Sequence, residues 1–349
     1  MAKFKAVFVE HDYKSIQPDR EIIEGAGGTL VDGDSFPVEK AWDLCADADA
    51  VMVRRLRVTR DMIGRLNRCR VLVRYGIGVD IIDLEAATER RIIVAHVPVY
   101  CQDEVSTHAI CLMLACVRRL QQTIDQVRNG AWDVHENDPI FRFAGKTAGL
   151  VGFGTLGQMV ARKLQGWNLR LLATDPFGEP DLAAALNVEL VPLEVLLRES
   201  DIVSLHAPLL PETTHLMNGR TFGWMKRGSI LVNTARGGIV DQAALLRALD
   251  SGQLTCAGLD VFEEEPLPSS SPLRNHRRVT VTDHMAWYSE EAQLELQRRA
   301  AREVVRACTG GLPEAIANPE VLVKLGRAAE WKPNHVATWQ ARRAQALSL

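Results

Sequence analysis

The 349-residue sequence lacks the features that would place it in a membrane or on nucleic acid. No apolar run reaches the roughly 20 residues that a membrane-spanning helix needs, and the first residues, MAKFKAVFVEHDYK, contain no signal-peptide cleavage pattern. The net charge is only −3, so no excess of basic residues would attract nucleic acid or an anionic membrane. We therefore expect neither partner, and we expect the protein in the cytoplasm.

The sequence also has few cysteines, and they do not form paired motifs. There are seven, an odd number, without a CxxC pair, whereas disulfide frameworks and zinc sites are built from paired cysteines. We expect reduced, mostly buried thiols and no metal site. Repeats and low-complexity tracts are missing as well. With 47% hydrophobic and 24% charged residues over this length, the composition is typical of a globular protein with two domains.

Short β-type runs alternate with helix-compatible stretches along most of the chain. The runs lie at 5–10, 49–54, 71–75 and 92–97, and then at 148–153, 169–174, 201–207, 229–235, 256–262 and 279–284. This alternation is typical of parallel sheets covered by helices. One long helix is predicted over about 106–128, between the two groups of strands. Another is predicted from Ser289 to about Cys308, and we expect it to return to the first domain, since no strand run follows it.

A glycine triplet within residues 148–175 predicts a dinucleotide site. It follows an apolar strand-like run and opens a helix-like run. Gly152 would form the tight turn, Gly154 would remove a side chain where backbone approaches a pyrophosphate, and Gly157 would let the helix pack closely on the strand. Because glycine-rich turns occur in many folds, the prediction depends on the strand, the helix and a terminal acid together.

The start of that helix and the end of the next strand complete the motif. Thr155 and Leu156 stand in the first helical turn, where free N–H groups and the positive end of the helix dipole would face phosphate. Asp175 ends the next strand, about 20 residues after the glycines, where a carboxylate would accept the ribose hydroxyls. It would repel a 2′-phosphate, so NAD is favoured over NADP. The other interpretation of Asp175 is a solvated acid at a strand end.

Ionisable residues stand at several later strand exits, where ligands bind in open α/β sheets. With a nicotinamide cofactor nearby, three of them suit reduction of a 2-oxo acid. Arg236 would grip carboxylate and carbonyl oxygens with its planar fork. His284 would protonate the developing alkoxide and reverse that step in oxidation. Glu265 would stabilise the imidazolium if it lies beside His284, although the acidic run EEE is also compatible with a solvated loop.

Three segments resemble the D-isomer-specific 2-hydroxyacid dehydrogenase family. They are NTARGGIVD (233–241), LDVFEEEP (259–266) and the segment around His284. The likeness runs from the first strand to about residue 320. DHMAWYSEEA (283–292) resembles the C-terminal-binding-protein branch, which comprises NAD-binding transcriptional corepressors and bacterial relatives. RYGIGVD (74–80) is shared by that branch and by D-3-phosphoglycerate dehydrogenases.

The resemblance implies an α/β fold with two doubly wound domains. A Rossmann NAD-binding domain, residues 103–293, would be inserted into a discontinuous flavodoxin-like substrate domain formed by 1–102 and 294–349. A homodimer through the NAD domain is also implied.

The family pattern assigns roles to individual residues of this chain. Arg236 would be the substrate clamp, His284 the acid/base and Glu265 its partner, while Asp260 would receive the nicotinamide amide. The remaining substrate positions are Arg74, Gly76, Ile77, Gly78 and Trp287, and the remaining cofactor positions are Val105, Thr107, His206, Ala207, Pro208, Thr213, Thr234 and Ala235. Two positions depart from the pattern: Thr107 replaces a common acid, and Asp283 replaces the proline common before the catalytic histidine.

The function expected from these residues is that of an NAD-dependent D-2-hydroxyacid dehydrogenase working mainly as a 2-oxo acid reductase. D-3-phosphoglycerate dehydrogenase and hydroxypyruvate or glyoxylate reductase are options within that class. The alternative is an NAD(H)-sensing scaffold like the corepressors. Arg54, Arg55 and Arg74 hint at an anionic or polar substrate tail and Trp287 at an apolar one, so the identity of the substrate stays open.

Overall fold

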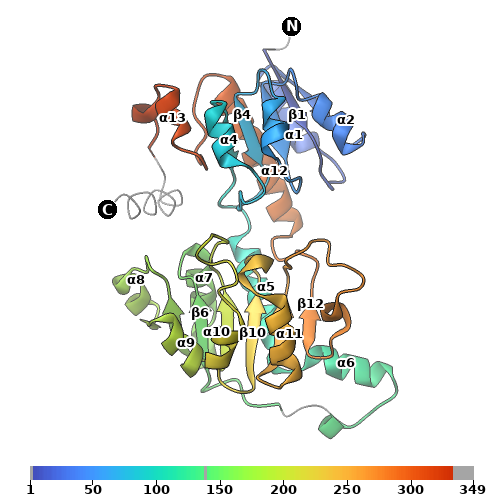
Figure 1. The fold of residues 1–349 in the computed structure, drawn as a ribbon, viewed down its shortest axis with the longest axis vertical. Helices are drawn as coiled ribbons and strands as arrows, with labels where there is room; N and C mark the ends of the chain where they lie inside the picture. Colours follow the sequence, from blue (N-terminus) through green and yellow to red (C-terminus); the bar gives the residue numbers. More distant parts are fainter. Residues whose placement is uncertain (1–2, 137–139, 333–349) are drawn as a thin grey trace. The chain divides into compact units, whose positions relative to one another are not determined.

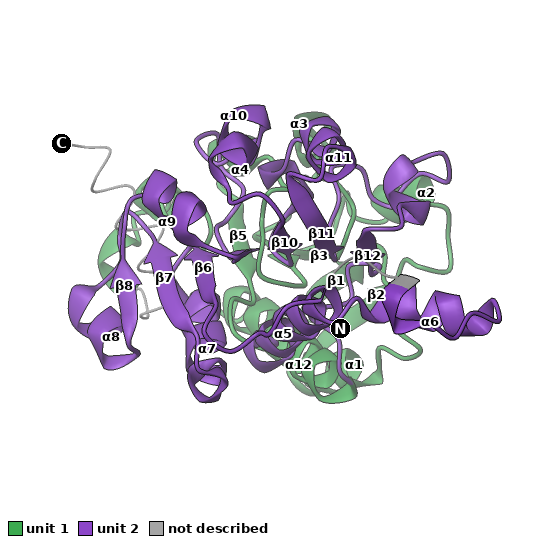
Figure 2. Cartoon of the chain, turned by 90° about the horizontal axis from the view of Figure 1, so that it is seen from below, with its two compact units in different colours: residues 1–100, 290–349 green, residues 101–289 purple. Residues whose placement is uncertain are grey.

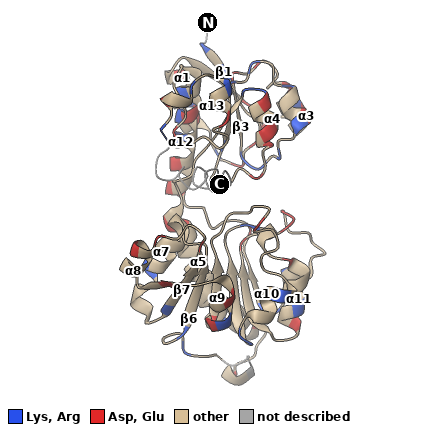
Figure 3. Cartoon of the chain, turned by 60° about the vertical axis from the view of Figure 1, so that its left-hand side comes forward, with Lys and Arg blue, Asp and Glu red and all other residues tan. Residues whose placement is uncertain are grey.

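The computed structural model describes residues 3–136 and 140–332, and these form two compact units. Unit 1 consists of residues 1–100 and 290–349, and unit 2 of residues 101–289 (Figure 2). The predicted boundaries differ from these by a few residues. Lysine and arginine are scattered among aspartate and glutamate along both units (Figure 3). Within the described ranges, no helix is long and apolar enough to cross a membrane.

Unit 1 is built on a parallel five-stranded sheet (Figure 1). Its strand order is β2-β1-β3-β4-β5, the flavodoxin-like order, so the predicted fold of this domain is confirmed. The strands are β1 (Phe4–Phe8), β2 (Gly28–Asp32), β3 (Ala50–Val53), β4 (Val71–Arg74) and β5 (Ile93–His96). The helices are α1 (Gln17–Gly25), α2 (Val38–Asp43), α3 (Arg60–Gly64), α4 (Leu84–Glu89), α12 (Glu290–Cys308) and α13 (Val321–Lys324).

The C-terminal part of the chain completes unit 1, as predicted. On α12, Gln297 Nε2 donates to Ser15 O at 2.9 Å and to Asp19 Oδ2 at 2.8 Å. Further on, Asn318 bonds to the backbone of β5, where its Oδ1 accepts from Val94 N at 2.8 Å. These buried polar contacts fix α12 and the segment after it to the sheet formed by the first hundred residues, which makes this domain discontinuous in sequence.

Unit 2 is a Rossmann fold with a parallel seven-stranded sheet. Its strand order is β12-β11-β10-β9-β6-β7-β8. Strands are added on one side of β6 up to β8 and on the other side from β9 onward, so the switch point of the sheet lies between β6 and β9. The strands are β6 (Thr147–Val151), β7 (Arg170–Thr174), β8 (Val188–Leu190), β9 (Ile202–Leu205), β10 (Ser229–Asn233), β11 (Leu254–Leu259) and β12 (Val279–Val281). The helices are α5 (Gln102–Val117), α6 (Leu120–Arg128), α7 (Thr155–Lys163), α8 (Pro180–Ala185), α9 (Leu193–Glu199), α10 (Gly219–Trp224) and α11 (Gln242–Asp250).

Successive strand residues of unit 2 pack into two separate cores, one on each face of the sheet. Leu150 belongs to the core that includes α5 and α7, whereas Val151 belongs to the core that includes α9, α10 and α11. The same alternation holds for Ile230 and Leu231 on β10, as expected for strands buried on both faces. The ends of unit 2 meet, because Ser289 Oγ donates to Glu104 Oε1 at 2.7 Å.

The single helix predicted over 106–128 is wrong, because the chain forms α5 and α6 with a break at Arg119. This residue has a φ of 53°, which no α-helix tolerates. Its guanidinium is buried and donates through Nη1 to Thr255 O at 2.6 Å and through Nη2 to Thr255 Oγ1. Two hydrogen bonds of Arg119 to a distant residue thus stabilise a backbone turn that its local sequence does not signal.

Candidate active site

The glycine motif forms a turn with no room for side chains at two of its three glycines. Gly152 has a φ of 96°, and an added Cβ would lie 2.6 Å from Ala207 N. At Gly157 an added Cβ would lie 2.2 Å from Gly152 O, so the first turn of α7 packs directly on the loop. Gly154 instead faces open space and is exposed. The start of α7, with Thr155 exposed and Leu156 partly exposed, is thereby left open to a phosphate.

Asp175 is fixed beside this turn by two backbone donors. Its Oδ2 accepts from Phe153 N at 2.7 Å, and its Oδ1 accepts from Phe177 N at 2.8 Å. The carboxylate at the end of β7 therefore lies against the middle of the glycine turn. This is the relation that a site for both the pyrophosphate and the adenosine ribose requires.

Two neighbouring strand exits hold buried polar atoms that lack a partner within the described ranges. Both ring nitrogens of His206, after β9, are of this kind, and so is Thr234 Oγ1, after β10. Burial lowers the pKa of His206 to about 4, so its imidazole is neutral. Buried polar atoms without a hydrogen bond destabilise the folded protein unless a ligand or a water molecule bonds to them. They fit a polar cofactor lying across the ends of β9 and β10, where Ala207 and Ala235 add little bulk.

The loop after β9 is held in shape by Thr213. Its hydroxyl accepts from Leu210 N at 2.8 Å and donates to Pro208 O at 2.6 Å. The Thr213 hydroxyl thus organises the loop that carries His206, Ala207 and Pro208.

His284 and Glu265 form the central contact of the site, as the sequence predicted. His284 Nδ1 lies 2.6 Å from Glu265 Oε2, and Glu265 Oε1 accepts from Phe262 N at 2.8 Å. Burial alone would raise the pKa of Glu265, but the hydrogen bond and charge of His284, the Phe262 amide and the charge of Arg236 hold this pKa below its ordinary value.

Arg236 is brought to this pair by a close approach of two backbone segments. An added Cβ at Gly237 would lie 1.9 Å from the carbonyl carbon of Phe262, so only glycine allows the exits of β10 and β11 to meet here. Asn233 shapes the turn, since its Oδ1 accepts from Ala235 N at 3.0 Å and its Nδ2 donates to Arg236 O at 2.9 Å. Arg236 is partly exposed and close enough to act on the charge of Glu265.

Asp260 organises the loop that carries His284. Its side chain is 1% exposed, and its carboxylate accepts from Thr282 Oγ1 at 2.6 Å, Met285 N at 2.9 Å and Ala286 N at 3.0 Å. In addition, His284 N donates to Asp260 O at 2.8 Å. His284 itself has a φ of 58°, in the left-handed region. Three of about four acceptor positions of the carboxylate are used within the chain, so a nicotinamide amide contact by Asp260 stays a prediction.

The sequence reasoning missed two residues of this network. Thr282 lies two positions before His284, and His108 Nε2 on α5 lies 3.0 Å from Thr282 Oγ1. A threonine two positions before a histidine at a strand exit was the one available signal. Nothing in the sequence pairs it with a residue 174 positions earlier.

The other predicted positions of unit 2 lie around these elements. Val105 is buried on α5, whereas Thr107 is exposed and its Oγ1 accepts from Lys163 Nζ at 2.6 Å. Residues two apart on a helix point in nearly opposite directions, so a shared nicotinamide contact by both stays a prediction. Asp283 is exposed, and Trp287 is partly exposed with its ring centroid 5.4 Å from that of Tyr288.

The predicted substrate loop of unit 1 follows β4. Gly76 has a φ of 142°, and an added Cβ would lie 1.2 Å from Arg74 Nη1, so the guanidinium folds back over the glycine. His96 Nδ1 donates to Ile77 O at 2.8 Å. Burial lowers the pKa of His96 to about 4, which keeps this imidazole neutral. Gly78 completes the loop and is partly exposed.

Comparison with known proteins gives the family. Residues 110–286 match the family model described as "D-isomer specific 2-hydroxyacid dehydrogenase, NAD binding domain". The chain belongs to this family. Unit 2 is therefore its NAD-binding domain, and the matched segment holds the glycine turn, Asp175, Arg236, Glu265 and His284.

The relatives within this family carry several activities in their names. The chain is 38% identical over 258 residues to a glyoxylate reductase of Korarchaeum cryptofilum, covering 73% of this chain and 78% of the relative. It is 36% identical over 282 residues to a D-3-phosphoglycerate dehydrogenase of Methanocaldococcus jannaschii, covering 80% of this chain and 53% of the relative. The chain thus spans about half the length of such phosphoglycerate dehydrogenases.

A solved structure shows the same fold at similar identity. The apo-structure of D-lactate dehydrogenase from Escherichia coli has a TM-score of 0.76 and 30% sequence identity, covering 90% of this chain and 99% of that chain. The names of these relatives all describe reactions of 2-hydroxy or 2-oxo acids, and they differ in which acid reacts.

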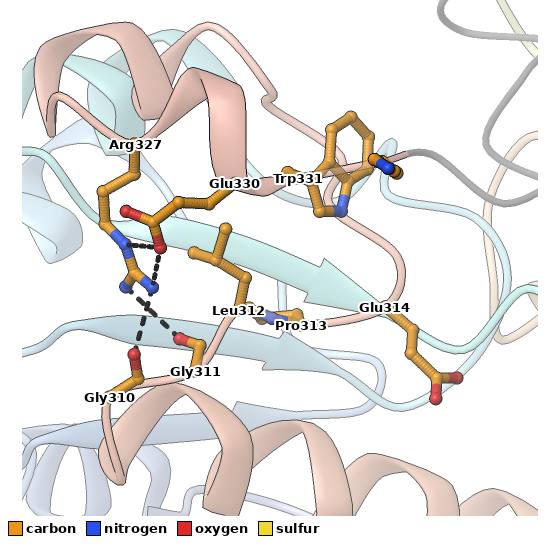
Figure 4. Close-up of a pocket in the computed structure, with 9 residues that line it drawn as sticks. Gly310, Gly311, Leu312, Pro313, Glu314, Arg327, Glu330 and Trp331 are labelled. Atoms are coloured by element: carbon orange, nitrogen blue, oxygen red, sulfur yellow. Dashed lines mark hydrogen bonds and ion pairs between the residues drawn. The ribbon is translucent and has the colours of Figure 1, made fainter.

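A hollow of about 750 Å³ in unit 1 involves none of the predicted site residues (Figure 4). It lies between the end of α12 and the segment after α13. Arg327 crosses it and donates to Gly310 O at 3.0 Å and to Glu330 Oε2 at 2.7 Å. Because the arginine is already bonded on both sides, the hollow adds nothing to the candidate active site.

The contact between Glu265 and His284 makes a prediction about titration. In a His284→Leu variant, the pKa of Glu265 is expected to rise above its ordinary value, because the raising effect of burial persists while the main lowering contact is lost. Carboxyl-carbon NMR titration of the wild type and the variant measures this. Glu303 of unit 1, whose pKa burial raises, serves as the internal control and should keep that raised pKa in both proteins. An unchanged Glu265 would show that His284 does not hold its charge.

Proposed function

We propose that this chain is an NAD-dependent D-2-hydroxyacid dehydrogenase that works mainly as a 2-oxo acid reductase. The observation that carries the proposal is the 2.6 Å contact between His284 Nδ1 and Glu265 Oε2, with Arg236 close enough to act on the same carboxylate. Reduction of a 2-oxo acid produces an alkoxide, which needs a proton donor and a positive group that stabilises its charge. A histidine held by a carboxylate, with a guanidinium nearby, supplies both.

In the proposed mechanism the side chains of unit 2 bind the acid and move one proton. When bound, NADH supplies the hydride that the keto carbon receives. Arg236 binds the carboxylate and the carbonyl oxygen, which orients the carbon and stabilises the negative charge that develops on the oxygen. His284 Nδ1 is engaged by Glu265, so Nε2 is the nitrogen that protonates the alkoxide. In oxidation the same nitrogen takes the proton from the hydroxyl.

The geometry of unit 2 also supports NAD as the cofactor. The open face at Gly154 and the start of α7 would hold the pyrophosphate, and Asp175 would hold the ribose hydroxyls. The buried atoms of His206 and Thr234 that have no partner among the described residues would face the rest of the cofactor. These residues fit the group, because they combine backbone donors, one carboxylate and buried polar atoms along consecutive strand exits.

The arginines of unit 1 bear on which acid is reduced. Arg54 is 5% exposed, and its Nη1 forms an ion pair with Asp12 while its guanidinium lies 5.1 Å from the centre of the Tyr13 ring. Arg55 Nη2 lies 3.3 Å from the same carboxylate. Asp12 thus offsets part of the positive charge of Arg54 and Arg55. A substrate with a second anionic group, such as a phosphate, would need that charge for binding. We therefore favour a small 2-oxo acid such as glyoxylate or hydroxypyruvate over a phosphorylated acid.

The first test of this function is turnover. Purified protein is expected to oxidise NADH with glyoxylate, hydroxypyruvate or a larger 2-oxo acid, measured by loss of NADH absorbance. His284→Ala should lower kcat by about 10²–10⁴-fold, the usual contribution of a general acid. Asp283→Asn, at the exposed neighbouring position, should retain most activity. No turnover on a broad panel would refute the enzyme, and NADH-dependent assembly without turnover would support a scaffold instead.

Cofactor choice provides a separate test. Asp175→Asn removes the charge that would repel a 2′-phosphate. Its single amide oxygen can still accept from one of the two backbone amides, those of Phe153 and Phe177, that the carboxylate now satisfies. The ratio of kcat/KM for NADH over NADPH is expected to fall about 10-fold or more in this variant. Asp181→Asn, an exposed acid on α8, should leave the ratio unchanged. Equal preference in wild type and Asp175→Asn would rule out the assigned role.

We also propose a homodimer formed through unit 2, and a cytoplasmic location, which the seven free thiols support. From α6 to the segment before β6, large apolar side chains are exposed. They are Leu120 (51%), Val127 (48%), Trp132 (89%), Val134 (75%) and Phe141 (69%). Large apolar side chains left exposed to water are candidates for a protein interface, and aromatic side chains are common anchors there.

The dimer makes a prediction about mass. Trp132→Glu combined with Phe141→Glu is expected to convert a dimer of the wild type into a monomer, because both would place a charge in an apolar interface. Size-exclusion chromatography with light scattering measures the mass. Val323→Glu on α13, where the valine is 72% exposed, is the matched control. A monomeric wild type would exclude the dimer, and a dimeric double variant would exclude this surface.

A further inference from the structure

We propose that His108 is a positioning residue for the catalytic histidine, acting through Thr282 and Asp260. The proposal rests on the function proposed above, since it concerns the same site. His108 stands on α5, and its side chain is 17% exposed. Its Nε2 lies 3.0 Å from Thr282 Oγ1 and 3.6 Å from Asp260 Oδ1.

The direction of the hydrogen bonds in this network follows from the number of available hydrogens. The Asp260 carboxylate is an acceptor for two backbone amides, those of Met285 and Ala286. Thr282 Oγ1 lies 2.6 Å from Asp260 Oδ1, so its single hydrogen is donated to this oxygen. The same hydroxyl must then accept from His108. His108 Nε2 therefore carries a hydrogen.

The opposite tautomer would leave the network unsatisfied. A hydrogen on Nδ1 alone would make Nε2 an acceptor that needs the hydrogen of the Thr282 hydroxyl. Thr282 Oγ1 and Asp260 Oδ1 would then be two acceptors 2.6 Å apart without a hydrogen between them, an arrangement that is costly in a buried site. The geometry thus selects one tautomer of His108.

This network holds the His284 loop on both sides. Thr282 is fixed before His284 by Asp260 and His108, and the amides of Met285 and Ala286 are fixed after it by Asp260. His284 needs such support, because its φ of 58° is one that residues with a Cβ adopt only when the surroundings impose it. His108 adds the link to α5, which packs on β10, β11 and β12. It therefore anchors the loop to a long helix as well as to the sheet.

The test compares a variant that lacks the donor with one that keeps it. His108→Leu removes the donor, and His108→Gln retains an N–H that Thr282 can accept. We expect His108→Leu to lower kcat by about 10–100-fold, the effect of a small misplacement of a reacting group, with little change in the KM of the 2-oxo acid or in NADH affinity. His108→Gln should restore most of kcat. His276→Leu, at a histidine of unit 2 whose side chain is also 17% exposed and whose ring contacts Asp250 instead, is the control and should match wild type.

Two further measurements make the proposal independent of a single variant. In a double-mutant cycle, His108→Leu should add little to the loss caused by Thr282→Val, since both act through one hydroxyl. Nitrogen NMR of wild-type protein labelled in histidine should show, at alkaline pH, a protonated Nε2 and an unprotonated Nδ1 for His108. An unprotonated Nε2, full kcat in His108→Leu, or additive losses in the cycle would each overturn the proposal.

The NMR measurement also separates this proposal from the proposed function. A wild type without turnover would refute the reductase while the tautomer of His108 is still read directly. If the leucine variant does not fold, the tautomer and the Thr282→Val variant decide. An active wild type with the wrong tautomer refutes only the role of His108.

Discussion

The buried carboxylate of Asp260 is the interaction on which the candidate active site depends. A charge taken out of water must be satisfied by the protein, and here a hydroxyl and two backbone amides do so within five consecutive residues. To reach one carboxylate, the chain between Thr282 and Ala286 has to wrap around it. The left-handed conformation of His284 is a consequence of that wrapping, and so is the place from which its ring contacts Glu265.

Close backbone approaches bring the strand exits together. Gly157 packs on Gly152, and Gly237 packs on Phe262, at distances that no Cβ permits. The first approach shapes the turn that would face the cofactor, and the second brings Arg236 close to Glu265 and its contact with His284. Both parts of the candidate site therefore depend on the same physical condition, which is backbone packed directly on backbone at the ends of parallel strands.

The parts that depend on local pattern were predictable, and the parts that depend on distant contacts were not. The central strands were predicted because their apolar runs are continuous, whereas β2 and β8 were missed. Both are edge strands with polar residues, so their sequences do not stand out. The break at Arg119 depends on Thr255, and the role of His108 depends on Thr282. By contrast, Arg236, Glu265 and His284 were recognisable because each follows a strand and belongs to a family motif.

The hydrogen bond between Ser289 and Glu104 has a consequence for how such a protein is assembled from parts. The segments that enter and leave the NAD-binding unit are joined at that point. For unit 1, which is discontinuous in sequence, the inserted unit 2 therefore behaves as a loop whose ends nearly touch. The entropy cost of closing such a loop grows only slowly with its length. A nucleotide-binding module can in this way be exchanged between hosts at two cuts, with the strand order of each host left intact.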